Sequence, residues 1–210
     1  MEPFFLTSTT YKREGSGGTS HGYPLKIRVA LRADVTRLTE ILAESFHTRQ
    51  GLGGLMYPIF RLGIYEDLRN RLATSSGYYT CLVAAIADSP HKLGNIPLNV
   101  PEHLVGTVEM GLRSPSPWSI GDRYPYISNL AVHPTARRQG VARELLIGCE
   151  QVAMKWGFSD LYLHVLENNS QARQLYHQVG YRIAQIDWSW DSVFLGQPRR
   201  LFLCKNLSHS

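Results

Sequence analysis

The chain has 210 residues, of which 43% are hydrophobic and 19% are charged, with a net charge of +5. This length fits one domain with a tail, and the hydrophobic fraction excludes a wholly disordered chain. No apolar run reaches the roughly 18–20 residues of a membrane span, so we expect no membrane partner. The moderate basic excess suits a small polyanionic ligand, and without a basic-aromatic motif we expect no nucleic-acid partner.

Three widely spaced cysteines, Cys81, Cys149 and Cys204, fit neither a disulfide framework nor a zinc site. The histidines also lack metal-ligand spacing, so we expect no metal. Reduced thiols favour a cytoplasmic location, with the plastid stroma as the alternative. The first residues have no basic leader and no long apolar run, and we therefore predict no signal peptide.

The sequence of the N-terminal half predicts a tail followed by three strands and two helices. Residues 1–24 are rich in Gly, Ser and Thr and predict a flexible tail, with a single domain over 25–210. A strand is expected over 26–31, a helix from Asp34 to Phe46, and a second helix after Pro58. Strands are expected over 78–87 and 103–112.

The C-terminal half carries the strongest helical pattern. After a loop over 113–123 and a strand over 126–132, apolar residues from Ala142 to Trp156 fall on one helical stripe that Gly157 ends. A strand over 160–166, a helix over 171–179 and strands over 181–188 and 200–207 follow. This order predicts a mixed α/β (α+β) fold.

The segment from His133 to Ala142 joins a strand to that amphipathic helix. Small residues at Gly140 and Ala142 permit a tight turn, and the free amides of a helix N-terminus bind phosphate. Arg137 and Arg138 add positive charge. These residues fit a phosphate site and a plain turn with solvated arginines equally well. No Walker-type or dinucleotide glycine motif is present.

The same segment carries a family resemblance. Arg137-x-x-Gly140-x-Ala142 resembles the acetyl-CoA motif of the GNAT acetyltransferases, and Asn169-x-x-Ala172-x-x-Leu175-Tyr176 with Gly180-Tyr181 is similar to the closing segment of that family. The resemblance covers about residues 124–190. It implies a GNAT fold: a twisted mixed sheet of about seven strands, flanked by about four helices.

The resemblance also implies an acetyl-CoA site with no metal. The pyrophosphate is expected on backbone amides of the motif, the pantetheine beside the preceding strand, and Asn169 against the cofactor arm. Tyr176 is expected near the thioester sulfur, where it protonates the thiolate, or else it is a buried aromatic of its helix. The expected cofactor-binding residues are Leu130, Val132, Arg137, Arg138, Gln139, Gly140, Val141, Ala142, Asn169 and Tyr176.

An amine must lose a proton before it attacks, so the site needs a base. His164 lies on the strand face shared with Tyr162 and Leu166. Its surroundings resemble N-terminal protein acetyltransferases that pair this histidine with a tyrosine, here Tyr126, and the two can hold a water that accepts the proton. A core histidine is the alternative role for His164, and Glu109 is the alternative base. The expected catalytic residues are therefore His164, Tyr176 and Tyr126.

These resemblances imply an N-acetyltransferase whose acceptor is a protein amine, either an N-terminal α-amine or a lysine side chain. A small amine, such as an arylalkylamine or a polyamine, is the first alternative acceptor. A non-catalytic module that senses acetyl-CoA is the alternative from another class. The loop over 113–123 and the stretch from Gly51 to Pro58 are expected to decide the acceptor.

Overall fold

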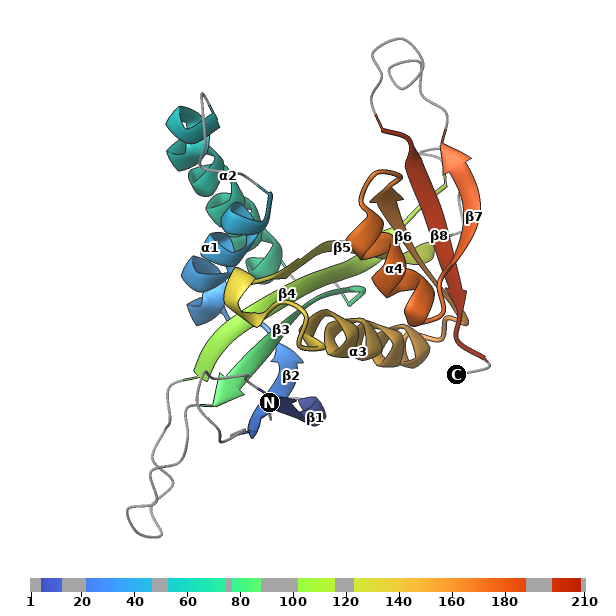
Figure 1. Ribbon diagram of the computed structural model, residues 1–210, viewed down its shortest axis with the longest axis horizontal. Helices are drawn as coiled ribbons and strands as arrows, with labels where there is room; N and C mark the ends of the chain where they lie inside the picture. The colour runs from blue at the N-terminus through green and yellow to red at the C-terminus, as the bar shows by residue number, and fades with distance from the viewer. Residues whose placement is uncertain are drawn as a thin grey trace, which may run out of the picture. The chain divides into compact units, whose positions relative to one another are not determined.

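The computed structural model describes residues 5–12, 22–46, 53–74, 77–87, 102–115, 123–187 and 198–208. It contains eight strands and four α-helices among these residues, with two short 3-10 turns (Figure 1). In chain order they are β1 (Phe5–Lys12), β2 (Gly22–Val29), η1 (Arg32–Asp34), α1 (Val35–Phe46), α2 (Gly53–Ala73), β3 (Tyr79–Ala87), β4 (Glu102–Arg113), β5 (Tyr124–Val132), η2 (Pro134–Ala136), α3 (Val141–Lys155), β6 (Asp160–Leu166), α4 (Ser170–Gln178), β7 (Arg182–Asp187) and β8 (Arg200–Asn206).

The chain forms two compact units. The first comprises residues 1–109 and 129–148, and the second comprises 110–128 and 149–210. Strands β4 and β5 and helix α3 therefore contribute residues to both. The hydrogen-bonded strand order is β1-β2-β3-β4-β5 in the first unit and β5-β6-β8-β7 in the second.

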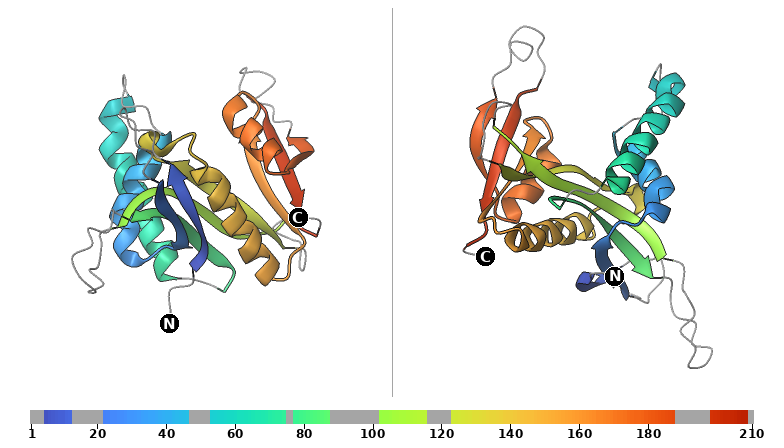
Figure 2. Two further views of the ribbon diagram at one scale, coloured as in Figure 1. Left: turned by 60° about the horizontal axis from the view of Figure 1, so that its bottom comes forward. Right: turned by 180° about the vertical axis from the view of Figure 1, so that it is seen from behind.

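The first unit has its core between strand β3 and the helix pair α1 and α2. Strand β3 is buried on both faces, and it contributes Cys81, Val83 and Ala85 to this core, because successive side chains of a strand point to opposite faces. They meet the apolar stripe of α1, where Leu38 and Ile41 are fully buried. Helices α1 and α2 pack against each other in both views of Figure 2.

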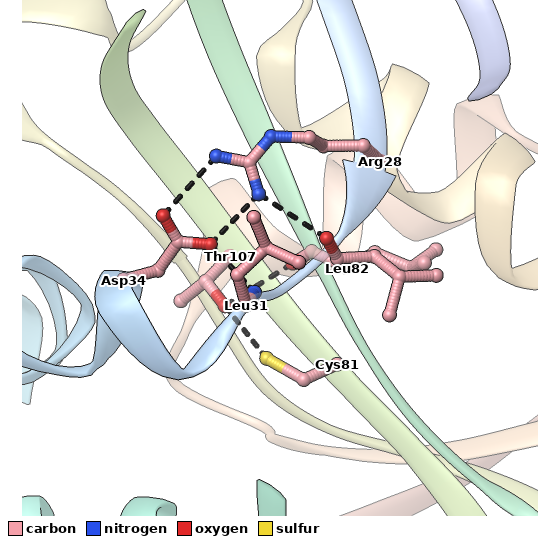
Figure 3. Close-up of polar contacts among 7 residues, drawn as sticks. Arg28, Leu31, Asp34, Cys81, Leu82 and Thr107 are labelled. Atoms are coloured by element: carbon pink, nitrogen blue, oxygen red, sulfur yellow. Dashed lines mark hydrogen bonds and ion pairs between the residues drawn. The ribbon is translucent and has the colours of Figure 1, made fainter. Parts of the chain in front are cut away.

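A polar corner fixes the turn from β2 into α1 (Figure 3). The Arg28 guanidinium donates to both carboxylate oxygens of Asp34, at 2.7 and 3.1 Å. The backbone N–H of Leu31 donates to Asp34 Oδ2 at 2.7 Å. In the same view the Thr107 hydroxyl of β4 donates to the Leu82 carbonyl of β3 at 3.2 Å. Asp34, the last residue of η1, thus binds the backbone N–H of the residue that precedes η1 and holds this turn ahead of α1.

Gly106 of β4 allows α3 to start close to the sheet. A Cβ placed on Gly106 would lie 2.9 Å from Val141 Cγ1 and 3.1 Å from Leu145 Cδ1. Both side chains belong to the first turns of α3, and both are buried. The glycine therefore sets the depth of the α3 N-terminus within the first unit.

The second unit is built on antiparallel pairing of β6 with β8 and of β8 with β7. His164 lies opposite Phe202, and Leu163 lies opposite Leu203. Leu161, Leu163 and Leu203 are buried on one face, whereas His164 and Phe202 are on the other. Helix α4 lies beside these strands in each view (Figures 1 and 2).

The mixed α/β architecture expected from the sequence is confirmed. Two details differ. Strand β1 lies within the segment expected to be a tail and pairs with β2 from Thr7 to Lys12, because threonines and Tyr11, which favour strands, occur there beside the glycines. Helix α2 begins at Gly53, ahead of Pro58. Most of the loop over 113–123 and the start of the stretch from Gly51 to Pro58 lie outside the described residues.

Candidate active site

The segment from His133 to Gly140 is a tight loop held to the end of β5. Arg138 and Gly140 both adopt left-handed backbone conformations, with φ of 65° and 83°. The Arg137 Nε donates to the Val132 carbonyl at 3.1 Å, and Gln139 Nε2 donates to the Thr135 carbonyl at 3.1 Å. These bonds fix the loop on the strand that precedes it and deliver the chain into α3.

The loop presents unpartnered backbone amides. The first hydrogen bond that enters α3 is donated by Glu144 to the Gly140 carbonyl, at 3.1 Å. Within the described residues, the N–H groups of 138–143 meet no acceptor. Open space surrounds the Cα of Gly140, since no atom lies within 4 Å of a Cβ built there. Free amides at a helix N-terminus beside exposed arginines can bind an anion such as a pyrophosphate.

The predicted cofactor-binding residues outside the loop differ in their burial and in the hydrogen bonds that they already make. Leu130 and Val132 are half-buried on β5, and the Val132 carbonyl already accepts the Arg137 bond. Val141 is buried and Ala142 is half-buried in the first turn of α3. Asn169 caps α4, accepting from the Ala172 N–H at 3.1 Å, which leaves its amide N–H groups without a partner among the residues described.

Glu109, the alternative base, is enclosed by donors in the first unit. Its carboxylate accepts from Arg71 at 2.9 Å, from the Tyr79 hydroxyl at 2.8 Å and from Asn129 Nδ2 at 2.7 Å. The Glu109 side chain is 1% exposed. Asn129 has a φ of 52°, so this bond also holds β5 in an unusual backbone conformation. Three donors on a buried carboxylate favour a structural role.

Tyr126 and His164, the two residues expected to act together, are in direct contact in the second unit. The Tyr126 hydroxyl lies 2.9 Å from His164 Nδ1. The opposite ring nitrogen, Nε2, lies 2.9 Å from Asp187 Oδ2. Strands β5 and β6 pair in parallel at Tyr126 and Tyr162, which brings the two side chains within reach. The result is a continuous hydrogen-bonded line from tyrosine through histidine to aspartate.

The electrostatics keep this imidazole neutral at neutral pH. Burial lowers the pKa of His164 from its ordinary value of 6.5, and the charge of Arg200 lowers it further, against the opposing effect of Asp187. The His164 side chain is 17% exposed. The guanidinium carbon of Arg113 lies 3.6 Å from the centroid of the Tyr126 ring, a cation–π contact. A neutral imidazole is a proton acceptor.

Tyr176 is buried on α4, and its ring packs edge-on against Tyr181 with centroids 5.9 Å apart. Burial raises the pKa of Tyr176 to about 12, with Tyr126 as the second cause. The hydroxyl therefore carries its proton at neutral pH.

A cavity of about 300 Å³ lies beside α4, with Leu201 and Leu203 in its lining. Those leucines alternate with Phe202, the neighbour of His164, so the cavity is on the opposite face of β8. It is separate from the Tyr126–His164 pair. The described residues contain no group of side chains able to hold a metal ion, and no described helix is long and apolar enough to cross a membrane.

Two features of the site were not predicted from the sequence. Asp187 lies at the end of β7, 23 positions from His164, and reaches it because β8 pairs with both β6 and β7. Arg71 and Tyr79 reach Glu109 from α2 and β3. In each case the signal depends on which strands and helices are neighbours, and the alternation within one strand does not reveal it.

Comparison with known proteins identifies the family of the chain. The model of the acetyltransferase (GNAT) family matches residues 64–181, more than half of the chain. The chain therefore belongs to the GNAT acetyltransferase family. It is an N-acetyltransferase of this class, with acetyl-CoA as cosubstrate.

Two relatives come from Arabidopsis thaliana. GCN5-related N-acetyltransferase 10, chloroplastic, is 29% identical over 83% of this chain and 68% of its own length. GCN5-related N-acetyltransferase 7, chloroplastic, is 30% identical over 66% of this chain. The chain spans about half the length of this second relative, 47%. Among solved structures, the PaiA N-acetyltransferase from Thermoplasma acidophilum in complex with coenzyme A is 19% identical and has a similar fold, with a TM-score of 0.61 over 87% of this chain and 98% of that one.

Proposed function

We propose that this enzyme acetylates protein amines, either N-terminal α-amines or lysine side chains. The observation that carries the proposal is the 2.9 Å contact between the Tyr126 hydroxyl and His164 Nδ1. At this distance no water fits between the two groups, and the contact supports a proton path that runs directly from the hydroxyl to the imidazole. A tyrosine paired with this histidine is also the arrangement of the N-terminal protein acetyltransferases that the sequence resembles.

The proposed reaction begins with loss of a proton from the acceptor ammonium. The Tyr126 oxygen takes that proton while its own proton moves to His164 Nδ1, which leaves a neutral amine and a cationic imidazole. Acetyl-CoA supplies the acetyl group as a thioester. The amine nitrogen bonds to the acetyl carbon, the carbon–sulfur bond breaks, and the nitrogen loses its second proton to solvent. The departing thiolate accepts a hydrogen bond from the Tyr176 hydroxyl and takes up a proton from solvent as it leaves as the thiol. The unpartnered amides of 138–143 and the charge of Arg138 hold the pyrophosphate.

The experiment is an acceptor panel read by mass spectrometry. Purified protein and acetyl-CoA are incubated with peptides that carry a free α-amine, with N-terminally blocked lysine peptides, and with small amines such as serotonin and spermidine. We expect acetylated peptides. Turnover of small amines alone would replace the proposal with the small-amine alternative, and tight acetyl-CoA binding without any turnover would favour the sensing module.

The base is tested by comparing His164→Ala with Glu109→Gln. A positioned base contributes roughly 10²–10⁴-fold to the rate, so His164→Ala lowers kcat by that order and removes the acidic limb of the pH–rate profile. Glu109→Gln places an amide among the donors Arg71, Tyr79 and Asn129. It lowers thermal stability and leaves that limb in place. Loss of the limb in a folded Glu109→Gln protein would reverse the assignment.

We also propose a plastid location in preference to the cytoplasm, because both relatives described above are named chloroplastic. A fluorescent fusion at the C-terminus, expressed in leaf cells, tests this. Signal confined to the cytosol would contradict it.

A further inference from the structure

The imidazole of His164 is held at both nitrogens, and only one of them meets the proposed proton path. Nδ1 faces the Tyr126 hydroxyl, whereas Nε2 faces Asp187 Oδ2 at 2.9 Å. We infer that Asp187 is a positioning residue of this enzyme, which fixes the tautomer of His164 and sets the pH at which it works. This inference rests on the proposed function of the Tyr126–His164 pair.

The tautomer follows from hydrogen-bond chemistry. An ionised carboxylate only accepts hydrogen bonds, so the proton of the neutral imidazole resides on Nε2. Nδ1 is then bare and accepts from the Tyr126 hydroxyl, the state from which a proton can be taken up. Without Asp187, no hydrogen bond favours this tautomer over the Nδ1–H tautomer. In that second tautomer Nδ1–H faces Tyr126, and Nδ1 cannot accept a proton.

Asp187 also has the right charge for the step. Proton uptake turns His164 into a cation in a half-buried place, and a carboxylate in contact with its far edge stabilises that cation. The second carboxylate oxygen of Asp187 lies 3.5 Å from Gln185 Nε2 on the same strand, which orients the group.

The charges around the ring oppose each other. Four strands bring ionisable groups toward His164: Tyr126 from β5, Arg113 from β4, Asp187 from β7 and Arg200 from β8. Both arginines lower the pKa of His164, whereas Asp187 raises it. Removal of Asp187 and removal of Arg200 therefore move the same pKa in opposite directions, which a merely structural role would not do.

The test uses Asp187→Asn, Arg200→Gln and, as the matched control, Asp160→Asn. Asp160 begins β6 and bonds Asn206, so its substitution removes one carboxylate from the same unit without contact with His164. The tautomer and pKa of His164 are measured by nitrogen NMR on histidine-labelled protein, with His164→Gln to assign the signal. The pH dependence of kcat/KM is measured with one peptide.

We expect Asp187→Asn to lower the pKa of His164 by about one unit and to reduce the Nε2-protonated population. Arg200→Gln raises the pKa, and Asp160→Asn leaves it unchanged. The acidic limb of kcat/KM follows each shift, and kcat of Asp187→Asn falls at every pH. Asp187→Glu, which restores the charge, recovers part of both effects.

The two ways to fail are distinct. An unchanged tautomer and pKa of His164 in folded Asp187→Asn protein would overturn the role of Asp187. A shifted NMR pKa with an unmoved kinetic limb would show that Asp187 tunes His164 but that His164 is not the base, which overturns the proposed function and the inference built on it.

Discussion

The buried residue Tyr176 can act on the departing sulfur in two ways, by transfer of its proton or by a hydrogen bond. The family resemblance implies an acid that protonates the departing thiolate. With a pKa of about 12, Tyr176 is a weaker acid than an ordinary thiol, whose pKa is about 8.5. Complete proton transfer to sulfur is therefore uphill by about 3.5 pKa units. A hydrogen bond from the hydroxyl to the developing negative charge requires no such transfer, and we propose that role.

The substitution Tyr176→Phe measures this bond. Loss of a hydrogen bond to a charged group costs about 1.5–3 kcal/mol, so kcat should fall roughly 10- to 100-fold while the KM for acetyl-CoA changes little. The measurement is steady-state kinetics across pH 6–9. A kcat equal to that of the unmodified enzyme would leave Tyr176 as a packing partner of Tyr181.

At the scale of elements, the bounds of a helix were predicted best where its own apolar residues form a continuous stripe. Helix α3 starts and ends within one residue of its expected bounds, because its apolar stripe is continuous and Gly157 closes it. Helix α2 starts before its expected beginning, since its apolar residues form no single stripe and Pro58 suggested a later start. The pairing of Tyr126 with His164 came from the family resemblance, whereas the contact with Asp187 requires the order β6-β8-β7. That order is not sequential, and alternation within a strand cannot supply it.

The loop before α3 permits a controlled test of the phosphate site. Gly140 and Gly157 lie at opposite ends of the helix with nearly equal φ, 83° and 85°, and neither has an atom within 4 Å of a built Cβ. Leucine at either position therefore costs a similar backbone strain, about 1–2 kcal/mol. Only the leucine at position 140 occupies the space beside the unpartnered amides.

We expect Gly140→Leu to weaken acetyl-CoA binding by at least about 100-fold, because two or more amide–phosphate hydrogen bonds are lost. Gly157→Leu keeps the affinity and loses a similar amount of stability. Calorimetric titration and thermal unfolding measure the two quantities. Equal affinities of the two variants would place the pyrophosphate elsewhere.

At the scale of the whole molecule, the net charge of +5 raises the question of whether the general field or a local charge attracts the polyanionic cosubstrate. At 0.1 M ionic strength the screening length is about 10 Å, so distant surface charges contribute little. Arg138 is exposed in the loop beside the free amides, whereas Arg32 is exposed in η1. Each substitution by glutamine lowers the net charge by one.

Arg138→Gln should weaken acetyl-CoA binding roughly 2- to 5-fold at low salt, the range of an exposed charge pair, and flatten the dependence of Kd on salt between 0.05 and 0.5 M. Arg32→Gln should leave both the affinity and the salt slope close to those of the unmodified protein, because Arg32 lies in η1 and is not part of the loop that presents the free amides. Titrations at four salt concentrations compare the slopes. Equal losses in the two variants would mean that the net charge of the molecule governs association, and the local role of Arg138 would then be rejected.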